Sequence, residues 1–289
     1  MTQAGGRIID CFAPRPLTGC PVAVFGEGLG GDPDTLAAVA TAVAMPAVAV
    51  DASDPPAAAT SAPPGRIDDP PTAVMAAAAS VARVGEPPDA IRMGGQTHAV
   101  TTDGAGHLWV GVDAPTVTPV DPSVETITAA LGLQEEQVAP VVERAPVAVA
   151  AGATTQLIIP VTYLSALAAL AVDTPALRTL CAAHGADAVF CYSFDTLTRQ
   201  AAVHGRPIPL EQAHPAASAT GALGCITALR AVGALGGTTD PVIVEQADHW
   251  GRPTRMAIDT SDGPRIGGQV QHTGELTLEA AVPGDIIIE

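Results

Sequence analysis

Two stretches of the sequence decide the fold: T-A-V-M-A-A-A-A-S-V-A-R-V at Thr72–Val84 and A-T-G-A-L-G-C-I-T-A-L-R-A-V at Ala219–Val232. Each is long enough for a helix and contains a single charged residue, an arginine. A helix that is apolar all round has no face to offer to water, so it must be buried. Strand-like runs such as Gly19–Phe25 and Ala188–Tyr192 flank both stretches. The pattern predicts a pseudo-duplicated α/β protein, with strands around one buried helix in each half.

The segments between these elements indicate how the chain is divided. Asp32 and Pro33 predict the N-cap and first turn of a helix over Pro33–Ala44. Asp51–Gly65 is rich in Ala, Pro and Ser and is expected to be a surface loop. Asp113–Val124 contains three prolines and no periodicity, and is the expected linker. We therefore expect two domains, residues 1–116 and 117–289, with a last strand that can return to the first half.

The composition excludes several classes of protein. Of the 289 residues, 47% are apolar and 15% charged, which is typical of a globular chain. There are 13 arginines, no lysine and 30 acidic residues. The resulting net charge of −17 argues against a nucleic acid or an anionic membrane as partner, because either would repel the chain. No signal peptide and no run of membrane-spanning length is visible, so we expect a cytoplasmic protein.

The sequence also argues against a cofactor. The five cysteines are scattered, without a C-x-x-C pair, so neither a zinc site nor a disulfide framework is indicated. No G-x-G-x-x-G follows a strand and opens a helix. A chain without lysine cannot form a Schiff base between a lysine side chain and PLP. We therefore expect no metal, nicotinamide, flavin or PLP.

A series of short motifs runs in order over nearly the whole chain. They are Asp10-Cys11-Phe12, Gly19-Cys20-Pro21-Val22-Ala23-Val24, Thr155–Pro160, Gly221-Ala222-Leu223 and Gly251-Arg252-Pro253-Thr254. Together they resemble the PhzF-like family of phenazine-biosynthesis isomerases, which is related in fold to diaminopimelate epimerase. The resemblance implies an α/β (α+β) fold of two pseudo-symmetric domains, each a curved mixed sheet wrapped around a central apolar helix. It places the active site in the cleft between them. We further expect a small-molecule carboxylate substrate and a homodimer.

The positions that carry the chemistry of that family do not match. The family has a proton-shuttling Glu in N-L-S-E-T, and Ala47 stands in its place here. Its G-H-P-T, at the first central helix, falls roughly on Val74–Ala77, so Met75 and Ala76 are expected near the substrate. The family Asp of D-P-A-T-G-S is replaced by Ala213 or His214, depending on the register.

The candidates for the missing acid–base group near the matched segments are Cys20, Asp68, Asp69, Glu211, His214 and Ser218. His214 precedes a buried helix and is of the residue type that titrates near neutral pH. It could instead be a histidine of a surface loop. Cys20 replaces a family Asn, and a thiol with a lowered pKa could transfer a proton. It could equally be a small buried residue.

The remaining candidates lie where the two buried helices begin. Asp68 and Asp69 precede Pro70-Pro71 and could supply a displaced carboxylate, or cap the helix, or face solvent. Ser218, Ala219 and Thr220 open the second helix and could bind a substrate carboxylate through a hydroxyl and free N–H groups. Ordinary N-capping explains Ser218 and Thr220 equally well.

Two functions follow from these features. The first is a cofactor-free isomerase that moves a proton and a double bond in a small conjugated carboxylate. Altered PhzF-like isomerases of this type serve bacterial natural-product pathways, such as the 4-alkylproline branch of lincomycin and pyrrolobenzodiazepine biosynthesis. The second is a non-catalytic small-molecule-binding protein on the same scaffold. The ionisable side chains that line the cleft between the two helices should distinguish them.

Overall fold

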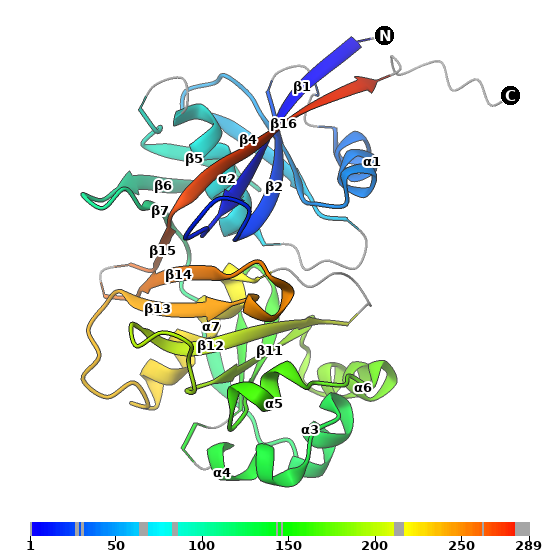
Figure 1. Ribbon diagram of the computed structural model, residues 1–289, viewed down its shortest axis with the longest axis vertical. Coiled ribbons are helices and arrows are strands. Elements are labelled where there is room, and N and C mark those ends of the chain that lie inside the picture. The colour runs from blue at the N-terminus through cyan, green and yellow to red at the C-terminus, as the bar shows by residue number, and fades with distance from the viewer. Residues whose placement is uncertain are drawn as a thin grey trace, which may run out of the picture.

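Two helices that lack a polar face form the centres of the two halves of the molecule. The computed structural model describes residues 2–26, 29, 32–63, 69–82, 86–142, 144–145, 147–210, 217–261 and 263–280. In it, a curved mixed sheet wraps around α2 (Pro70–Ala82) in the first lobe and another around α7 (Ala219–Ala231) in the second (Figure 1). The predicted fold class is confirmed.

The first lobe contains the N-terminal strands and also the last strand of the chain. Its strands are β1 (Thr2–Cys11), β2 (Cys20–Phe25), β3 (Ala47–Val50), β4 (Ala57–Ser61), β5 (Ala90–Met93), β6 (Gln96–Thr102), β7 (Leu108–Gly111) and β16 (Val270–Ala280). The β2–β3 and β4–β5 pairs are parallel, and the other pairs are antiparallel. Because β16 pairs with β1, both ends of the described chain lie in this lobe.

The second lobe repeats the arrangement. Its strands are β8 (Thr116–Pro119), β9 (Ala148–Ala151), β10 (Thr155–Pro160), β11 (Ala188–Ser193), β12 (Ala201–Pro209), β13 (Val242–Gln246), β14 (Thr254–Asp259) and β15 (Arg265–Gly268). The β15–β7 pair joins the strands of the two lobes into one continuous 16-stranded sheet.

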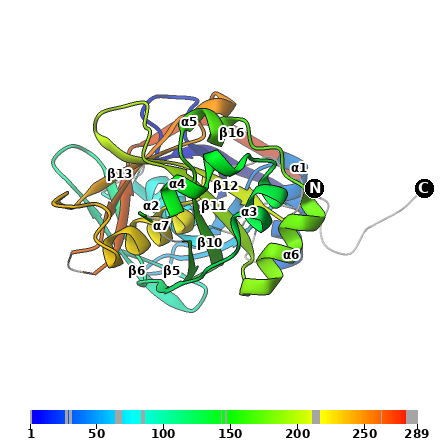
Figure 2. The same ribbon diagram turned by 90° about the horizontal axis from the view of Figure 1, so that it is seen from below.

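The shorter helices cover the outside of the sheets. In the first lobe this is α1 (Pro33–Val43), whose start confirms the predicted cap: Asp32 accepts a hydrogen bond of 2.8 Å from the backbone N–H of Thr35. In the second lobe, helices gather at the end remote from the first lobe (Figures 1 and 2). They are α3 (Val124–Leu131), α4 (Ala139–Val142), α5 (Leu164–Ala168) and α6 (Thr174–His184), with a 3₁₀ turn at Glu135–Gln137; a second 3₁₀ turn, Asp248–Trp250, follows β13.

Both central helices are buried, but they pack differently. In α2, every residue from Pro71 to Ala79 is buried, and alanines fill most of the positions. In α7, glycines allow the backbone to approach the sheet closely. A Cβ atom at Gly221 would lie 2.3 Å from the Phe190 ring, and one at Gly224 would lie 2.7 Å from Ala150 Cβ. The second helix can therefore pack against β9–β11 only with glycine at these positions.

Two segments expected to be irregular form strands. The expected loop Asp51–Gly65 contains β4, and the expected linker Asp113–Val124 contains β8. Both strands are short, and each pairs with a strand about 30 residues further along the chain, β4 with β5 and β8 with β9, so tertiary context overrides their weak local propensity. The expected boundary between residues 116 and 117 falls inside β8, and the division into domains at that point stays a prediction.

The described chain includes no helix that is long and apolar enough to cross a membrane. All five cysteines are described, and each is buried and outside any disulfide.

Candidate functional site

The N-termini of the two central helices meet at the carboxylate of Asp69. Its Oδ2 accepts a hydrogen bond of 3.0 Å from the N–H of Ala219. Its Oδ1 accepts a hydrogen bond of 2.9 Å from the N–H of Thr220 and one of 2.8 Å from the Thr220 hydroxyl. The fold thus brings together three of the predicted site residues, although they come from different halves of the chain.

Asp69 also caps its own helix. Its backbone carbonyl accepts from the N–H groups of Thr72 and Ala73, at 3.0 and 3.3 Å. The Thr72 hydroxyl donates to the same carboxylate. Asp69 therefore satisfies donors at the start of both α2 and α7, which is the helix-cap interpretation. Its role as a displaced catalytic carboxylate stays a prediction.

The other donors at the start of α7 are satisfied by buried polar side chains. Ser218 is the N-cap, and its Oγ accepts 2.9 Å from the N–H of Gly221. The amide of Gln246 holds Ser218 on both sides: it accepts from the Ser218 N–H at 2.9 Å and donates to the Ser218 carbonyl at 3.1 Å. Gln156 donates to the Ser218 hydroxyl at 3.2 Å. Ser218 thus fills the capping role.

Two cysteines lie beneath this junction. Cys11 and Cys20 face each other across the β1–β2 pair, and both are buried. The Cys11 thiol donates to the Thr72 carbonyl at 3.6 Å, and the Cys20 thiol to the Ala217 carbonyl at 3.7 Å. Burial, with the neighbouring Cys20, Asp10 and Asp69, raises the pKa of Cys11 well above its ordinary value. Cys11 therefore stays a neutral thiol at physiological pH.

A pocket of about 690 Å³ opens beside the helix starts, between the two lobes. We call it the interdomain pocket. Of its lining residues, Pro70 and Pro71 belong to α2, and Thr220 and Leu223 belong to α7. Most other lining residues are apolar, and the ionisable ones among the described residues are His98 and Asp113.

His98 extends from β6 and is partly buried. Its Nδ1 lies 3.1 Å from the carbonyl oxygen of Gly111. A carbonyl only accepts, so Nδ1 must carry the proton and Nε2 is left as the basic atom of the neutral ring. The strand and this bond fix the imidazole in one orientation.

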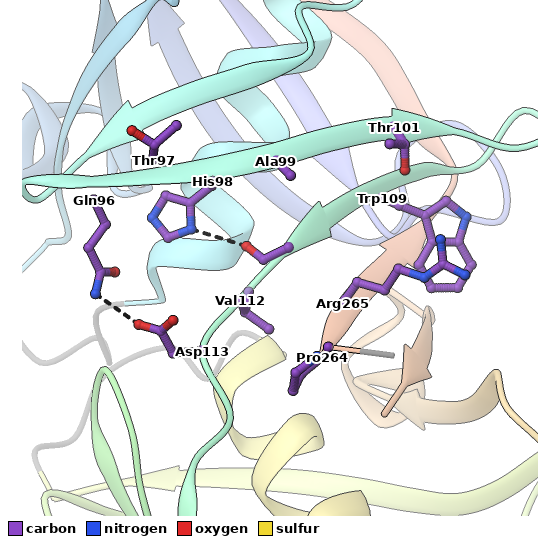
Figure 3. Close-up of a pocket in the computed structure, with 12 residues that line it drawn as sticks. Gln96, Thr97, His98, Ala99, Thr101, Trp109, Val112, Asp113, Pro264 and Arg265 are labelled. Carbon is purple, nitrogen blue, oxygen red and sulfur yellow. Dashed lines mark hydrogen bonds between the residues drawn. The ribbon is translucent and has the colours of Figure 1, made fainter. Parts of the chain in front are cut away.

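A second hollow, of about 530 Å³, adjoins the first and shares Gln96, His98, Val112 and Asp113 with it (Figure 3). Gln96 Nε2 donates to Asp113 Oδ2 at 2.8 Å, which holds the carboxylate beside His98.

The far end of this hollow is formed by Trp109 and Arg265. The guanidinium lies 4.8 Å from the centroid of the indole ring and donates to Asp259. This end is thus closed by an arginine that already has a carboxylate and an aromatic partner.

The structure places Met75, Ala76 and Ala47 away from the described pockets. Met75 and Ala76 are fully buried in the interior of α2, because that helix begins at Pro70. Ala47 is buried with Leu36 and Ala40 under α1. His214 lies outside the described residues, as do Asp68 and Glu211. The binding role expected of Met75 and Ala76 and the acid–base role expected of His214 or Asp68 stay predictions.

Sequence reasoning missed His98, Gln96 and Asp113. His98 lies in none of the motifs that carry the family resemblance, and Asp113 begins the expected linker. One signal was available: Gln96 and His98 are two residues apart on a strand, so they share a face. Which way that face points depends on strand pairing and on the docking of the lobes. Among the described residues, no group of three or more His, Cys, Asp or Glu side chains is arranged to hold a metal ion.

Comparison with known proteins identifies the fold. No family model and no curated protein matches the sequence. Among solved structures, a phenazine biosynthesis protein of the PhzF family from Bacillus anthracis superposes with a TM-score of 0.81 at 15% identity, over 97% of this chain and 100% of that one. A structure described as a predicted epimerase from Pseudomonas aeruginosa gives 0.79 at 21%, over 96% and 100%.

A hydroxyproline epimerase from Agrobacterium vitis, with bound trans-4-hydroxy-L-proline, is more distant. It gives a TM-score of 0.54 at 11% identity, over 98% of this chain and 94% of that one. At these identities the likeness concerns architecture. The chain has the fold of the PhzF-like and diaminopimelate epimerase-like proteins.

Proposed function

We propose that the protein is a cofactor-independent isomerase that moves a proton, and with it a double bond, in a small conjugated metabolite bound in the interdomain pocket. The observation that carries the proposal is His98, a histidine held in one tautomer at the wall of a pocket between the lobes. A histidine can take up and release a proton near neutral pH. The fold is shared with epimerases, which is consistent with proton transfer at carbon.

In this proposal His98 Nε2 accepts the proton from one carbon of the substrate and returns it to another. The Gly111 carbonyl keeps Nδ1 protonated and stabilises the imidazolium while it carries the extra proton. Asp113, held by Gln96, is positioned to bind a polar end of the substrate. The replacement of the family Glu by Ala47 is part of the proposal, because it requires that another group supplies the base.

The finer expectations from the sequence remain part of this proposal. They are a role in bacterial natural-product biosynthesis of the 4-alkylproline type, a cytoplasmic location and a homodimer. His214 stays the acid–base candidate predicted from sequence, and His98 is the candidate that the described pocket supports.

A second function, binding without catalysis, is favoured by one specific contact. The Asp69 carboxylate occupies the first N–H groups of α7, where a substrate carboxylate was expected. A scaffold that fills its own anion site with a side chain has lost one means of orienting a substrate. The two functions therefore differ in whether His98 exchanges protons with a bound molecule.

Deuterium exchange tests the proposal directly. The purified protein is incubated in D₂O with a panel of conjugated carboxylates and conjugated amines, and incorporation at carbon is followed by NMR. An isomerase that works by proton transfer should label at least one of them. His98→Gln should lower the rate about 100- to 10,000-fold, because it removes the acid–base group.

Two variants make the result specific. His107→Gln is the matched control, because His107 lies near the same strands but pairs with Asp103 and lines neither described pocket. The His107→Gln variant should catalyse deuterium incorporation into the compound at the rate of the parent protein. His214→Ala tests the prediction from sequence: if that variant loses exchange and His98→Gln does not, the acid–base role belongs to His214. If no compound in the panel is labelled, binding without catalysis is the better description.

A further inference from the structure

We propose that the interdomain pocket takes an apolar ligand that carries a protonated amine, and that Asp69 is a built-in substitute for a ligand carboxylate. The inference names the ligand class of the pocket in the proposed function. It shares the pocket with that function but does not require turnover.

The first step is an account of the backbone donors at the two helix starts. In α7, the N–H of Ala219 and that of Thr220 donate to Asp69. The N–H of Gly221 donates to the Ser218 hydroxyl, and the N–H of Ser218 donates to the side-chain oxygen of Gln246. An incoming carboxylate would have to displace one of these acceptors to bind here.

The start of α2 offers no replacement. Pro70 and Pro71 have no N–H, and the next two donors, Thr72 and Ala73, already bind the Asp69 carbonyl. The backbone N–H groups at both helix N-termini beside the pocket therefore already have acceptors within the chain.

The second step is the charge of the pocket. No arginine is among its described lining residues, and the chain has no lysine. Asp113 lines it as a carboxylate whose Oδ2 accepts from Gln96. A second carboxylate, Asp69, lies directly behind Thr220. The net charge of −17 contributes a negative electrostatic potential, of the same sign as that of the two carboxylates. A cation is attracted by this arrangement and an anion is repelled.

The third step is the remaining surface of the pocket. Pro71, Val112, Pro115 and Leu223 line it, and Thr220 donates its hydroxyl proton to Asp69. These groups suit a hydrocarbon or an aromatic ring. An ammonium group on that body can reach Asp113, with the apolar part against the helix starts.

The experiment compares three probes with the same aromatic body: 2-phenylethylamine, 2-phenylethanol and phenylacetate. Each is titrated into the full chain at neutral pH by isothermal calorimetry, with saturation-transfer NMR as a second readout. The amine should bind at least about tenfold more tightly than phenylacetate. Equal or tighter binding of phenylacetate overturns the proposal, and so does the absence of binding by all three.

Variants then assign the preference to the named groups. Asp113→Asn should reduce the affinity of the amine to about that of the alcohol. Asp121→Asn is the control, because it removes one exposed negative charge that does not line the pocket, and it should keep the preference. If both variants lose the preference equally, the net charge of the protein and not the pocket is responsible, and the proposal is wrong.

Asp69→Ala should open the α7 donors and allow phenylacetate to bind. If that variant does not fold, Asp69→Asn still accepts from the helix but lacks the charge, and it should weaken amine binding without admitting the carboxylate. An unchanged ligand preference in the variant that folds contradicts the role given to Asp69. Amine preference without any deuterium exchange would leave this inference standing while the isomerase proposal fails.

Discussion

The two central helices resemble each other in composition but begin in different ways. α2 starts with Pro70 and Pro71, which have no donors to satisfy, and its next N–H groups bind the carbonyl of Asp69, the residue just before it. α7 starts with four N–H groups, and their acceptors come from the N-cap Ser218, from Gln246 on β13 and from Asp69 in the other lobe. The start of α2 is therefore built locally, whereas the start of α7 depends on the docking of the two lobes. This difference makes Asp69 a link between the halves.

Packing of α7 against its sheet should give the largest effect. Gly221→Ala would place a Cβ 2.3 Å from the Phe190 ring and 2.6 Å from Gln156 Oε1. The gain in helix propensity of about 1 kcal/mol is outweighed by the clash, so we expect a net loss of about 3 kcal/mol in the free energy of unfolding. Urea denaturation followed by circular dichroism measures it.

Gly237→Ala is the control for this substitution, because a Cβ there would meet no atom within 4 Å. Its stability should stay within about 0.5 kcal/mol of the parent. Equal effects at the two positions would show that α7 does not require a close approach to the sheet.

The shared cap should give the next largest effect. Asp69→Ala removes a carboxylate that accepts from α7 and from the hydroxyl of Thr72. We expect a loss of about 2 kcal/mol, because donors of two helices lose their acceptor. Asp173 caps α6 alone, through the N–H of Ala176, so Asp173→Ala should cost about 1 kcal/mol. Thermal unfolding of both variants makes the comparison, and equal losses would mean that Asp69 matters to one helix only.

The smallest effect concerns acid stability in the second lobe. Glu245, next to Gln246, is buried and accepts from His204, from the Thr198 hydroxyl and from the N–H groups of Leu197 and Thr198. Desolvation raises the pKa of this carboxyl, but the hydrogen bonds from His204, Thr198 and Leu197 and the charge of Arg255 together outweigh it and lower the pKa from 4.5 to about 2.

A folded-state pKa below the unfolded value means that the unfolded chain binds more protons between pH 4.5 and about 2. The stabilisation is complete above pH 4.5 and is lost as the pH falls through that window, by about 1 kcal/mol or more. Glu245→Gln should flatten the dependence of the urea midpoint on pH in this range. Glu125→Gln removes the same charge from an exposed position on α3, and it should leave the pH dependence of the urea midpoint unchanged. An unaltered slope in Glu245→Gln would mean that other carboxyls govern acid unfolding.

For the candidate site, the sequence indicated several of the residues but not the contacts between them. Asp69, Ser218, Ala219 and Thr220 were singled out from sequence because each adjoins the start of an apolar helix, and the structure brings Asp69 into contact with Ala219 and Thr220. That Asp69 would fill the donors of α7 could not be predicted, since it lies 151 residues from Thr220 and the contact requires both lobes in place.

The sequence by itself determined the class of the fold and its two centres. A helix of alanine, leucine and valine without a polar face is stable only when covered, and this is a local property that can be read from composition. The tertiary structure alone decided what lines the pocket. His98 and Gln96 occupy one face of β6, where both residues pair with β5, and the docking of the second lobe places that face beside the helix starts. Lobe docking joins residues that lie far apart in the chain, and no local pattern specifies the partner that a side chain will meet across it.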